Sequence, residues 1–344
     1  MASELTSIAR SIVANDRGIL AADESTGTIK KRFDTIGVES TESSRRAYRD
    51  LLFTTDGMEE LIGGVILFDE TIRQSTDDGT PFPDLLAAKG VVPGIKVDTG
   101  AHPLAGSPGE TVTEGLDGLR GRLEEYYGLG ARFAKWRATY SVGVGTPSRL
   151  CLEANAHALA RYAALCQEAG IVPIVEPEVL MDTTHSIDEC YDATARTLQA
   201  LFEELDCHGV DLQGTLLKPN MVIPGKGNAD QASPERIAAA TLDCFRRHVP
   251  AAVTGIVFLS GGQSEVEATL NLDAINRLDG RVWPLSFSYG RALQASALRA
   301  WGGSPENAPA AQAAFLHRAR CNAAAVGGRY DSAVERRVET PVTG

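Results

Sequence analysis

The sequence predicts an α/β protein whose strands and helices close into one (β/α)8 barrel. Three observations carry this prediction. Short apolar segments rich in β-branched and aromatic residues recur about every 30 to 45 residues, the length of a strand-plus-helix unit. Amphipathic stretches separate them. No Pro/Ser-rich linker divides the chain, so we expect a single domain over residues 1–329, followed by a flexible C-terminal tail over residues 330–344.

Eight segments have the length and composition of strands, and each ends in polar or glycine residues. They are Gly18–Glu24, Gly64–Glu70, Gly94–Gly100, Phe133–Tyr140, Ile171–Leu180, Gln213–Val222, Thr254–Gly262 and Trp283–Gly290. Alternation with helices favours a parallel sheet, and eight units favour closure into a TIM barrel. The alternative is a doubly wound open sheet. It predicts a GxGxxG loop after the first strand, whereas Ala22-Asp23-Glu24-Ser25 stands there.

Helix start signals lie between these segments. The first is Thr41, which opens a helix to Phe53. Pro147-Ser148 opens a long helix to Ala169, which Gly170 ends. Ser233-Pro234-Glu235 combines a capping serine with proline at the first helical position, and Ser304-Pro305-Glu306 repeats that pattern.

Composition excludes several classes of partner. The chain has 33 Lys and Arg against 45 Asp and Glu, a net charge of −12, which disfavours nucleic acid and anionic membranes. Six scattered cysteines without a CxxC pair predict reduced thiols and a cytoplasmic protein. Arg10 and Ser11 interrupt the apolar residues near the N-terminus, so we expect no signal peptide. No apolar run reaches the roughly 18 residues of a membrane span.

A metal site is not predicted. The six histidines lie outside the eight strand segments and form no HxH or HxxxH pair, so we expect them on the surface or at helix ends. The loop Gly225-Lys226-Gly227-Asn228 lacks the rest of a GxxxxGK[ST] nucleotide-binding motif. We therefore expect no zinc site built from histidines and no nucleotide-binding loop of that kind.

Charged residues lie inside strand segments that should be apolar. Burying an unpaired charge is costly, so each needs a partner or a function. Residues two apart on a strand share a face, which pairs Lys96 with Asp98, Lys135 with Arg137, and Glu176 with Glu178. One interpretation is a set of interior salt bridges. The other is an active site, favoured because these residues, with Asp23 and Lys218, lie near the C-terminal strand ends, where barrel enzymes build their sites.

Lys218 is the candidate nucleophile. Leu216 and Leu217 precede it and Pro219 follows. An apolar environment and a nearby cation, for which Lys135 is a candidate, disfavour the ammonium form and free the amine to attack a carbonyl. Glu176 can then move protons while a carbinolamine forms and loses water.

Two glycine-containing turns predict a phosphate site. Ser260-Gly261-Gly262 follows the seventh strand and Ser288-Tyr289-Gly290-Arg291 the eighth. Barrels often bind phosphate at these two loops through backbone N–H groups and a helix N-terminus. Arg291 would add a charge-assisted contact. The substrate expected from both observations is a phosphorylated carbonyl compound.

The chain resembles class I fructose-1,6-bisphosphate aldolases from about Ile8 to Gly328. The matching segments are GILAADESTGTIKKR (18–32), GGVILFDET (63–71), GIKVD (94–98), PLAG-xx-GET (103–111), FAKWR (133–137), GIVPIVEPE (170–178), GTLLKPNMV (214–222), FLSGGQS (258–264) and SYGRALQASALRAWGG (288–303). The length and number of these segments make the resemblance specific.

The resemblance implies a role for each candidate. Lys218 forms a Schiff base with the substrate ketone, Glu176 moves protons beside it with Glu178 and Lys135 nearby, and Asp23 takes the C4 hydroxyl proton. The implied residues of the C1 phosphate site are Ser260, Gly261, Gly262, Ser288, Gly290 and Arg291, and those toward the C6 phosphate are Ser25, Thr28, Arg32, Lys96 and Arg137.

The implied activity is reversible cleavage of fructose 1,6-bisphosphate to dihydroxyacetone phosphate and glyceraldehyde 3-phosphate, in glycolysis and gluconeogenesis. It implies no metal or cofactor and a homotetramer, and the composition suggests a bacterial source. Two alternatives stay open: Schiff-base transfer or condensation with other sugars, and a non-enzymatic sugar-phosphate binder or scaffold. One departure concerns enamine protonation, which a terminal tyrosine assists in animal members. This chain ends in Gly344, and its last tyrosine is Tyr330.

Overall fold

Eight parallel strands form a closed barrel in the computed structural model, which describes residues 2–336. The order around the barrel is β1-β10-β9-β8-β7-β6-β3-β2, and β2 pairs with β1 to close it. The strands are β1 (Gly18–Ala21), β2 (Ile62–Leu67), β3 (Val92–Lys96), β6 (Phe133–Tyr140), β7 (Val172–Val179), β8 (Leu216–Leu217), β9 (Gly255–Phe258) and β10 (Leu285–Tyr289). Each lies in or overlaps a predicted segment, so the predicted barrel is confirmed.

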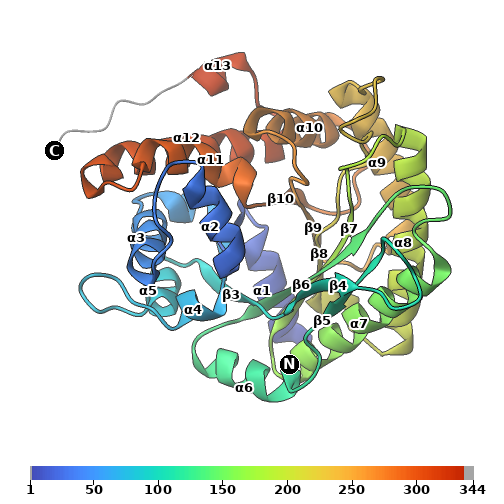
Figure 1. The fold of residues 1–344 in the computed structure, drawn as a ribbon, viewed down its shortest axis with the longest axis horizontal. Helices are drawn as coiled ribbons and strands as arrows, with labels where there is room; N and C mark the ends of the chain where they lie inside the picture. The colour runs from blue at the N-terminus through green and yellow to red at the C-terminus, as the bar shows by residue number, and fades with distance from the viewer. Residues whose placement is uncertain (1, 337–344) are drawn as a thin grey trace.

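Helices surround the barrel (Figure 1). They are α1 (Ala2–Ile12), α2 (Thr26–Asp34), α3 (Glu42–Phe53), α4 (Asp69–Ile72), α5 (Phe82–Ala88), α6 (Leu119–Gly128), α7 (Arg149–Glu168), α8 (Ile187–Cys207), α9 (Pro234–His248), α10 (Glu265–Arg277), α11 (Arg291–Trp301), α12 (Ala308–Val326) and α13 (Ser332–Arg336). Three 3-10 turns are η1 (Met58–Glu60), η2 (Leu212–Gly214) and η3 (Pro305–Asn307). An antiparallel pair, β4 (Gly100–Pro103) and β5 (Thr111–Glu114), follows β3 and was not predicted.

Three of the four predicted helix starts are confirmed by their caps. The side chains of Thr41, Ser148 and Ser233 each accept a hydrogen bond from the backbone of the first turn of α3, α7 and α9. The prediction at Ser304 is wrong, because this serine makes no capping bond and a 3-10 turn follows it. Asn307 explains the turn, since its N–H donates to the Ser304 carbonyl at 3.1 Å and its side-chain amide to that of Trp301 at 3.0 Å.

Side chains alternate between the barrel interior and the helical layer. In β6, Phe133 belongs to the interior cluster, whereas Ala134 and Trp136 pack in the outer core. In β7, Ile174 faces the interior and Val175 the helices. This alternation follows from the two-residue period of a strand. It sends the odd-numbered residues of β6 and the even-numbered residues of β7 into the barrel.

Helix α1 closes the end of the barrel where the strands begin. Its apolar residues Leu5, Ala9 and Ile12 are buried with the interior-facing residues of the strands. A side chain at Gly63 would overlap the carbonyl oxygen of Ile12, so α1 approaches β2 at a distance that only glycine permits. The interior is therefore sealed at this end, and access is from the opposite end.

The last described residues pack against α10 and α12. Tyr330 is buried, its N–H donates to Asp273 at 2.8 Å, and its hydroxyl donates to Glu335 at 2.6 Å. Glu335 also forms an ion pair with Arg318 at 2.7 Å. The division between a barrel over 1–329 and a tail over 330–344 stays a prediction, and residues 337–344 of that tail lie outside the described part.

The six cysteines are unpaired and all lie in helices. His185 is buried just before the N-cap of α8, and its Nδ1 lies 2.6 Å from the hydroxyl of Thr183. Within residues 2–336, no helix combines the length and apolar character that crossing a bilayer requires.

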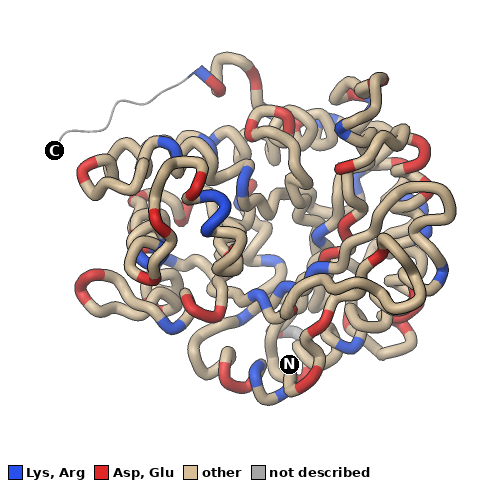
Figure 2. Tube along the Cα trace, in the orientation of Figure 1, with Lys and Arg blue, Asp and Glu red and all other residues tan. Residues whose placement is uncertain are grey.

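Acidic and basic residues are spread around the periphery of the fold (Figure 2).

Candidate active site

The strand alternation places the charged residues at the open end of the barrel. Ile174 faces the interior of β7, so Glu176 and Glu178, two and four residues later, face the same way. In the same manner Phe133 precedes Lys135 in β6, and Leu216 of β8 precedes Lys218. The interior surface thus changes from apolar to charged along each strand, toward the C-terminal ends that carry the active sites of such barrels.

A chain of buried ion pairs joins four candidates. Lys135 Nζ lies 2.8 Å from Asp23 Oδ2 and 3.3 Å from Glu176 Oε2. Lys218 Nζ lies 3.2 Å from the other oxygen of Glu176. The backbone N–H of Lys218 donates to the Val175 carbonyl at 2.8 Å, which fixes the lysine beside β7. Glu176 therefore bridges two lysines, one of which is the predicted nucleophile.

Burial and charge oppose each other in this network. Burial alone would raise the pKa of Asp23, but the ammonium groups of Lys135 and Lys218 outweigh it and hold that pKa well below its usual range. Burial alone would lower the pKa of Lys135, but Asp23, Glu176 and Asp98 raise it above its usual value. Asp23 is therefore a carboxylate and Lys135 an ammonium group at neutral pH.

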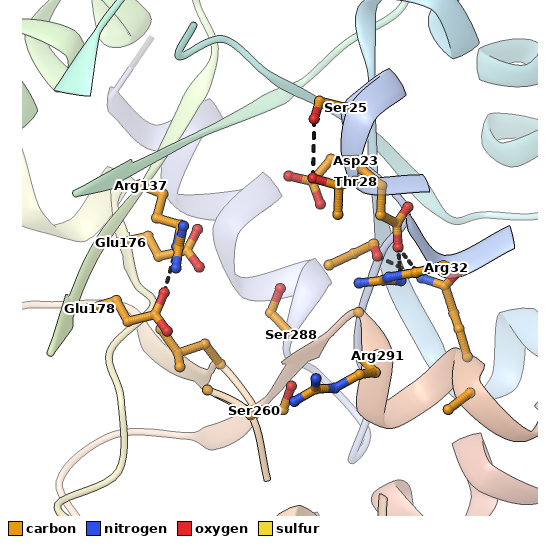
Figure 3. A pocket seen from close by; sticks show the side chains of 18 of the residues that line it. Asp23, Ser25, Thr28, Arg32, Arg137, Glu176, Glu178, Ser260, Ser288 and Arg291 are labelled. Carbon is orange, nitrogen blue, oxygen red and sulfur yellow. Dashed lines mark hydrogen bonds and ion pairs between the residues drawn. The ribbon is translucent and has the colours of Figure 1, made fainter. Parts of the chain in front are cut away.

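Three further cations flank this network, and each contacts a carboxylate. Lys96 Nζ lies 2.6 Å from Asp98 Oδ1, and Arg137 Nε lies 2.5 Å from Glu178 Oε2. Arg32 pairs with Glu24, which also pairs with Arg49 of α3. The hydroxyl oxygens of Ser25 and Thr28 lie 3.1 Å apart (Figure 3).

The two glycine turns meet on the other side of the cavity. Gly261 and Gly262 have φ values of 54° and 93°, a left-handed backbone that favours glycine. Gly290 caps α11, so the free N–H groups of that helix begin at Arg291. The buried hydroxyl of Ser288 has no hydrogen-bond partner in residues 2–336, and the Arg291 guanidinium has no ion pair there. These donors are available to an anion.

A cavity of about 900 Å³ contains all of these groups. All sixteen predicted site residues line it, and the lining carries nine Lys and Arg side chains against five carboxylates. A chain with a net charge of −12 therefore presents an excess of positive charge in its cavity. The assigned role of each residue stays a prediction.

Sequence reasoning missed several residues of the lining. They are Lys31, Lys226, Gln294, Arg299 and Glu24. Glu24 is adjacent to the predicted site residue Asp23. Its partner Arg49 lies in α3, and no sequence motif there indicates that this arginine reaches Glu24. Lys226 belongs to the loop Gly225-Lys226-Gly227-Asn228, in which the sequence shows only an incomplete nucleotide-binding motif.

The described lining contains no histidine or cysteine. Two groups elsewhere have possible ligand atoms within 4.8 Å of one another: His157 with Glu204 and His208, and His317 with Cys321 and Glu335. Both lie on helices of the outer layer rather than in the cavity. A role for either group in the chemistry of the cavity is therefore not indicated.

Comparison with known proteins gives the family. The family model for fructose-bisphosphate aldolase class-I matches residues 4–341. The chain belongs to the class I fructose-bisphosphate aldolases. The resemblance inferred from the sequence is thereby confirmed, and the enzyme is a carbon–carbon lyase of the class that works without a metal.

Relatives of this aldolase come from bacteria and plants. The chain is 55% identical over 328 residues to a probable fructose-bisphosphate aldolase class 1 of Xylella fastidiosa, covering 95% of this chain and 98% of the relative. It is 56% identical over 330 residues to the cytosolic fructose-bisphosphate aldolase 6 of Arabidopsis thaliana, covering 96% and 92%.

A solved structure agrees with the aldolase fold. The fructose-bisphosphate aldolase of Plasmodium falciparum, solved in complex with TRAP and a small-molecule inhibitor, superposes with a TM-score of 0.95. The two chains are 48% identical, and the match covers 96% of each.

Proposed function

We propose that this aldolase cleaves fructose 1,6-bisphosphate through a Schiff base on Lys218. The observation that carries the proposal is the bridge made by Glu176, whose two oxygens lie 3.2 and 3.3 Å from the Nζ atoms of Lys218 and Lys135. One carboxylate can accept a proton from the nucleophile while a second cation remains beside it. Such an arrangement suits amine attack on a carbonyl.

The first half of the reaction forms the iminium ion. Glu176 takes a proton from Lys218, and the free amine attacks the C2 carbonyl of the substrate to give a carbinolamine. Glu176 then returns a proton to the departing hydroxyl group, which leaves as water. Lys135 holds the position of this carboxylate and balances its charge.

The second half breaks the C3–C4 bond. Asp23 takes the proton of the C4 hydroxyl, the bonding electrons move into the iminium ion, and glyceraldehyde 3-phosphate leaves. The resulting enamine is protonated at C3, and water then hydrolyses the iminium ion, which releases dihydroxyacetone phosphate and the amine of Lys218. Asp23 is ready for its step because its lowered pKa keeps it ionised.

The two ends of the cavity bind the two phosphates in this proposal. Gly261, Gly262 and the N-terminus of α11 offer backbone donors to the C1 phosphate, with Arg291 as the charged partner. Ser260, Ser288 and Gly290 complete that end. Lys96 and Arg137, with Ser25, Thr28 and Arg32, lie toward the C6 phosphate. Positive charge at both ends favours a substrate with two phosphates.

We also propose a cytoplasmic homotetramer with no cofactor, whose barrel ends at residue 329. Relatives named cytosolic support the location, and the unpaired cysteines are consistent with a reducing compartment. Light scattering on the purified chain would give the subunit number, and the proposal fails if the mass is that of a monomer.

The decisive experiment is chemical trapping. Borohydride reduction in the presence of dihydroxyacetone phosphate should add one stable adduct, and peptide mass spectrometry should map it to Lys218. Lys218→Ala should abolish both the adduct and cleavage, and Lys89→Ala serves as the matched lysine control outside the cavity. Cleavage that survives Lys218→Ala, or that EDTA abolishes, would contradict the mechanism.

A further inference from the structure

The loop after Lys218 carries a second lysine into the cavity. Lys226 lines the cavity together with Gly262 and Arg291. A Cβ atom placed on Gly262 would lie 2.5 Å from Lys226 Nζ and 3.3 Å from Arg291 Nη2. Both cations therefore converge on the Gly261-Gly262 turn that lines the cavity.

Backbone hydrogen bonds fix the position of this lysine. The N–H of Lys226 donates to the Met181 carbonyl at 2.8 Å. Its neighbours Gly225 and Gly227 donate to the carbonyls of His185 and Thr183 at 2.9 and 3.0 Å. A side chain at Gly225 would overlap the Thr183 oxygen, so this contact requires glycine. The loop is thereby held against the segment that follows β7, with Lys226 directed at the cavity.

The charge of Lys226 is only weakly compensated. Its nearest carboxylate among the described residues is Asp182, 3.6 Å away, and the side chains of the pair are 44% and 72% exposed. This distance exceeds a hydrogen bond, and exposed pairs of this kind contribute little. Arg291 beside it has no ion pair in residues 2–336. Two neighbouring cations without a strong partner repel each other, and a dianion between them would remove that repulsion.

We propose that Lys226 is a further substrate-binding residue, which contacts the phosphate held by Gly261, Gly262 and Arg291. On binding, the ammonium group exchanges Asp182 for the phosphate dianion. Arg291 supplies a planar fork and Lys226 a compact point charge, so the two contacts complement each other. The inference rests on the proposed function of this end of the cavity, and it explains why the loop after Lys218 is clamped against the segment after β7.

The expected signature is a change in KM rather than in kcat. The C1 phosphate takes part in no bond that is made or broken, so its contacts should be equally strong in the ground and transition states. Lys226→Met should raise KM for fructose 1,6-bisphosphate about tenfold at low ionic strength, with kcat changed less than about twofold. The inhibition constant of inorganic phosphate should rise by a similar factor. Lys226→Arg should restore most of the affinity, and Lys30→Met is the matched control for loss of a surface charge.

Two further measurements separate the possible outcomes. The KM of fructose 1-phosphate should rise by the same factor, because it shares the C1 phosphate. An effect confined to the bisphosphate, or no effect with either sugar, would overturn the inference. Asp182→Asn should lower KM about twofold, since it removes the competing carboxylate, and an increase would contradict the proposed exchange.

Borohydride trapping distinguishes this inference from the mechanism on which it rests. The adduct at Lys218 should form in both the unmodified enzyme and Lys226→Met, with more dihydroxyacetone phosphate needed for half-saturation in the variant. Absence of the adduct from the unmodified enzyme would refute the Schiff-base proposal itself. An adduct with unchanged half-saturation would refute only the role of Lys226.

Discussion

Asp23 and Lys135 form a buried ion pair, with 2.8 Å between Oδ2 and Nζ, although they come from strands that are not neighbours in the barrel. Asp23 follows β1, and Lys135 lies in β6. The pair therefore spans the open end of the barrel and connects its first strand to the wall that carries Glu176. It has both a chemical and a structural consequence.

The stability losses from removing Asp23 and Lys135 should not be additive. Lys135→Met leaves Asp23 and Glu176 buried near each other, and we expect a loss of about 3 to 5 kcal/mol in the free energy of unfolding, with activity reduced by at least about a hundredfold. The double variant with Asp23→Asn should lose less than the sum of the single changes. Urea unfolding of the four proteins measures this coupling. Additive losses would show that the pair does not act as a unit.

Asp23 should also make stability depend on acid pH. Its pKa is lower in the folded protein than in the unfolded chain, so the unfolded state binds a proton first as pH falls. The stabilisation is present above about pH 4, the ordinary aspartate value, and is lost below it. Lys135 has a raised pKa, so its contribution is lost only at strongly alkaline pH. Between pH 3 and 6, unfolding free energies of Asp23→Asn should fall less steeply than those of the unmodified enzyme, and equal slopes would contradict this.

Arg137 should distinguish substrates with one phosphate from those with two. It lies with Lys96 at the end assigned to the C6 phosphate and pairs there with Glu178. Arg137→Leu should raise KM for fructose 1,6-bisphosphate by about ten- to a hundredfold, because a charge-assisted contact is lost. The KM for fructose 1-phosphate should change by less than about threefold, a difference opposite to the equal effect expected for Lys226→Met. Equal losses for both sugars would place Arg137 elsewhere.

The barrel interior should not accept a side chain at Gly94. A Cβ atom there would overlap the ring of Phe133, which fills the interior between β3 and β6. Gly94→Ala should therefore reduce the free energy of unfolding by about 1 to 3 kcal/mol. Gly121 in α6 is the matched control, since no atom lies within 4 Å of its Cβ position and alanine there should stabilise by about 0.5 to 1 kcal/mol. Thermal unfolding of the two variants should shift in opposite directions.

Thiol titration should find one reactive cysteine. Cys207 is exposed at the end of α8, whereas the other five are buried. Burial raises the pKa of Cys190 to about 11 and that of Cys244 to about 12, so few thiolates form near pH 8. A disulfide reagent should modify one of the six thiols in the folded protein and all six in denaturant. Cys207→Ser should remove the fast reaction, and several fast thiols would contradict the burial.

The fold was predictable because strand composition repeats along the whole chain. The site was predictable where a charge interrupts an apolar strand, as at Lys135, Glu176 and Lys218. The antiparallel pair β4 and β5 was missed because its segments are short, polar and exposed. At Ser304 the capping pattern was present, but the local contacts of Asn307 selected a 3-10 turn.

Residues in loops were the harder part of the site. Nothing in a sequence marks that Glu24 meets Arg49 of α3, or that the loop of Lys226 folds back toward Gly262. These contacts join segments that are distant in the chain, and their partners depend on the closed barrel. Strand periodicity could therefore predict the site residues on strands, such as Lys135, but not those on the surrounding loops, such as Glu24 and Lys226.

The closure of the barrel by α1 determines the route by which substrate enters and products leave. Apolar side chains fill the interior, and among residues 2–336 the helix seals the end where the strands begin. Among the described residues α1 therefore closes one end of the barrel, and in the proposed reaction both products leave by the opening at the C-terminal strand ends, through which the sugar enters. In the proposed mechanism the aldehyde leaves through this opening while the three-carbon product is still covalently bound to Lys218. In the condensation direction of the proposed reaction this order is reversed. The three-carbon fragment is already bound to Lys218 in the cavity when the aldehyde enters.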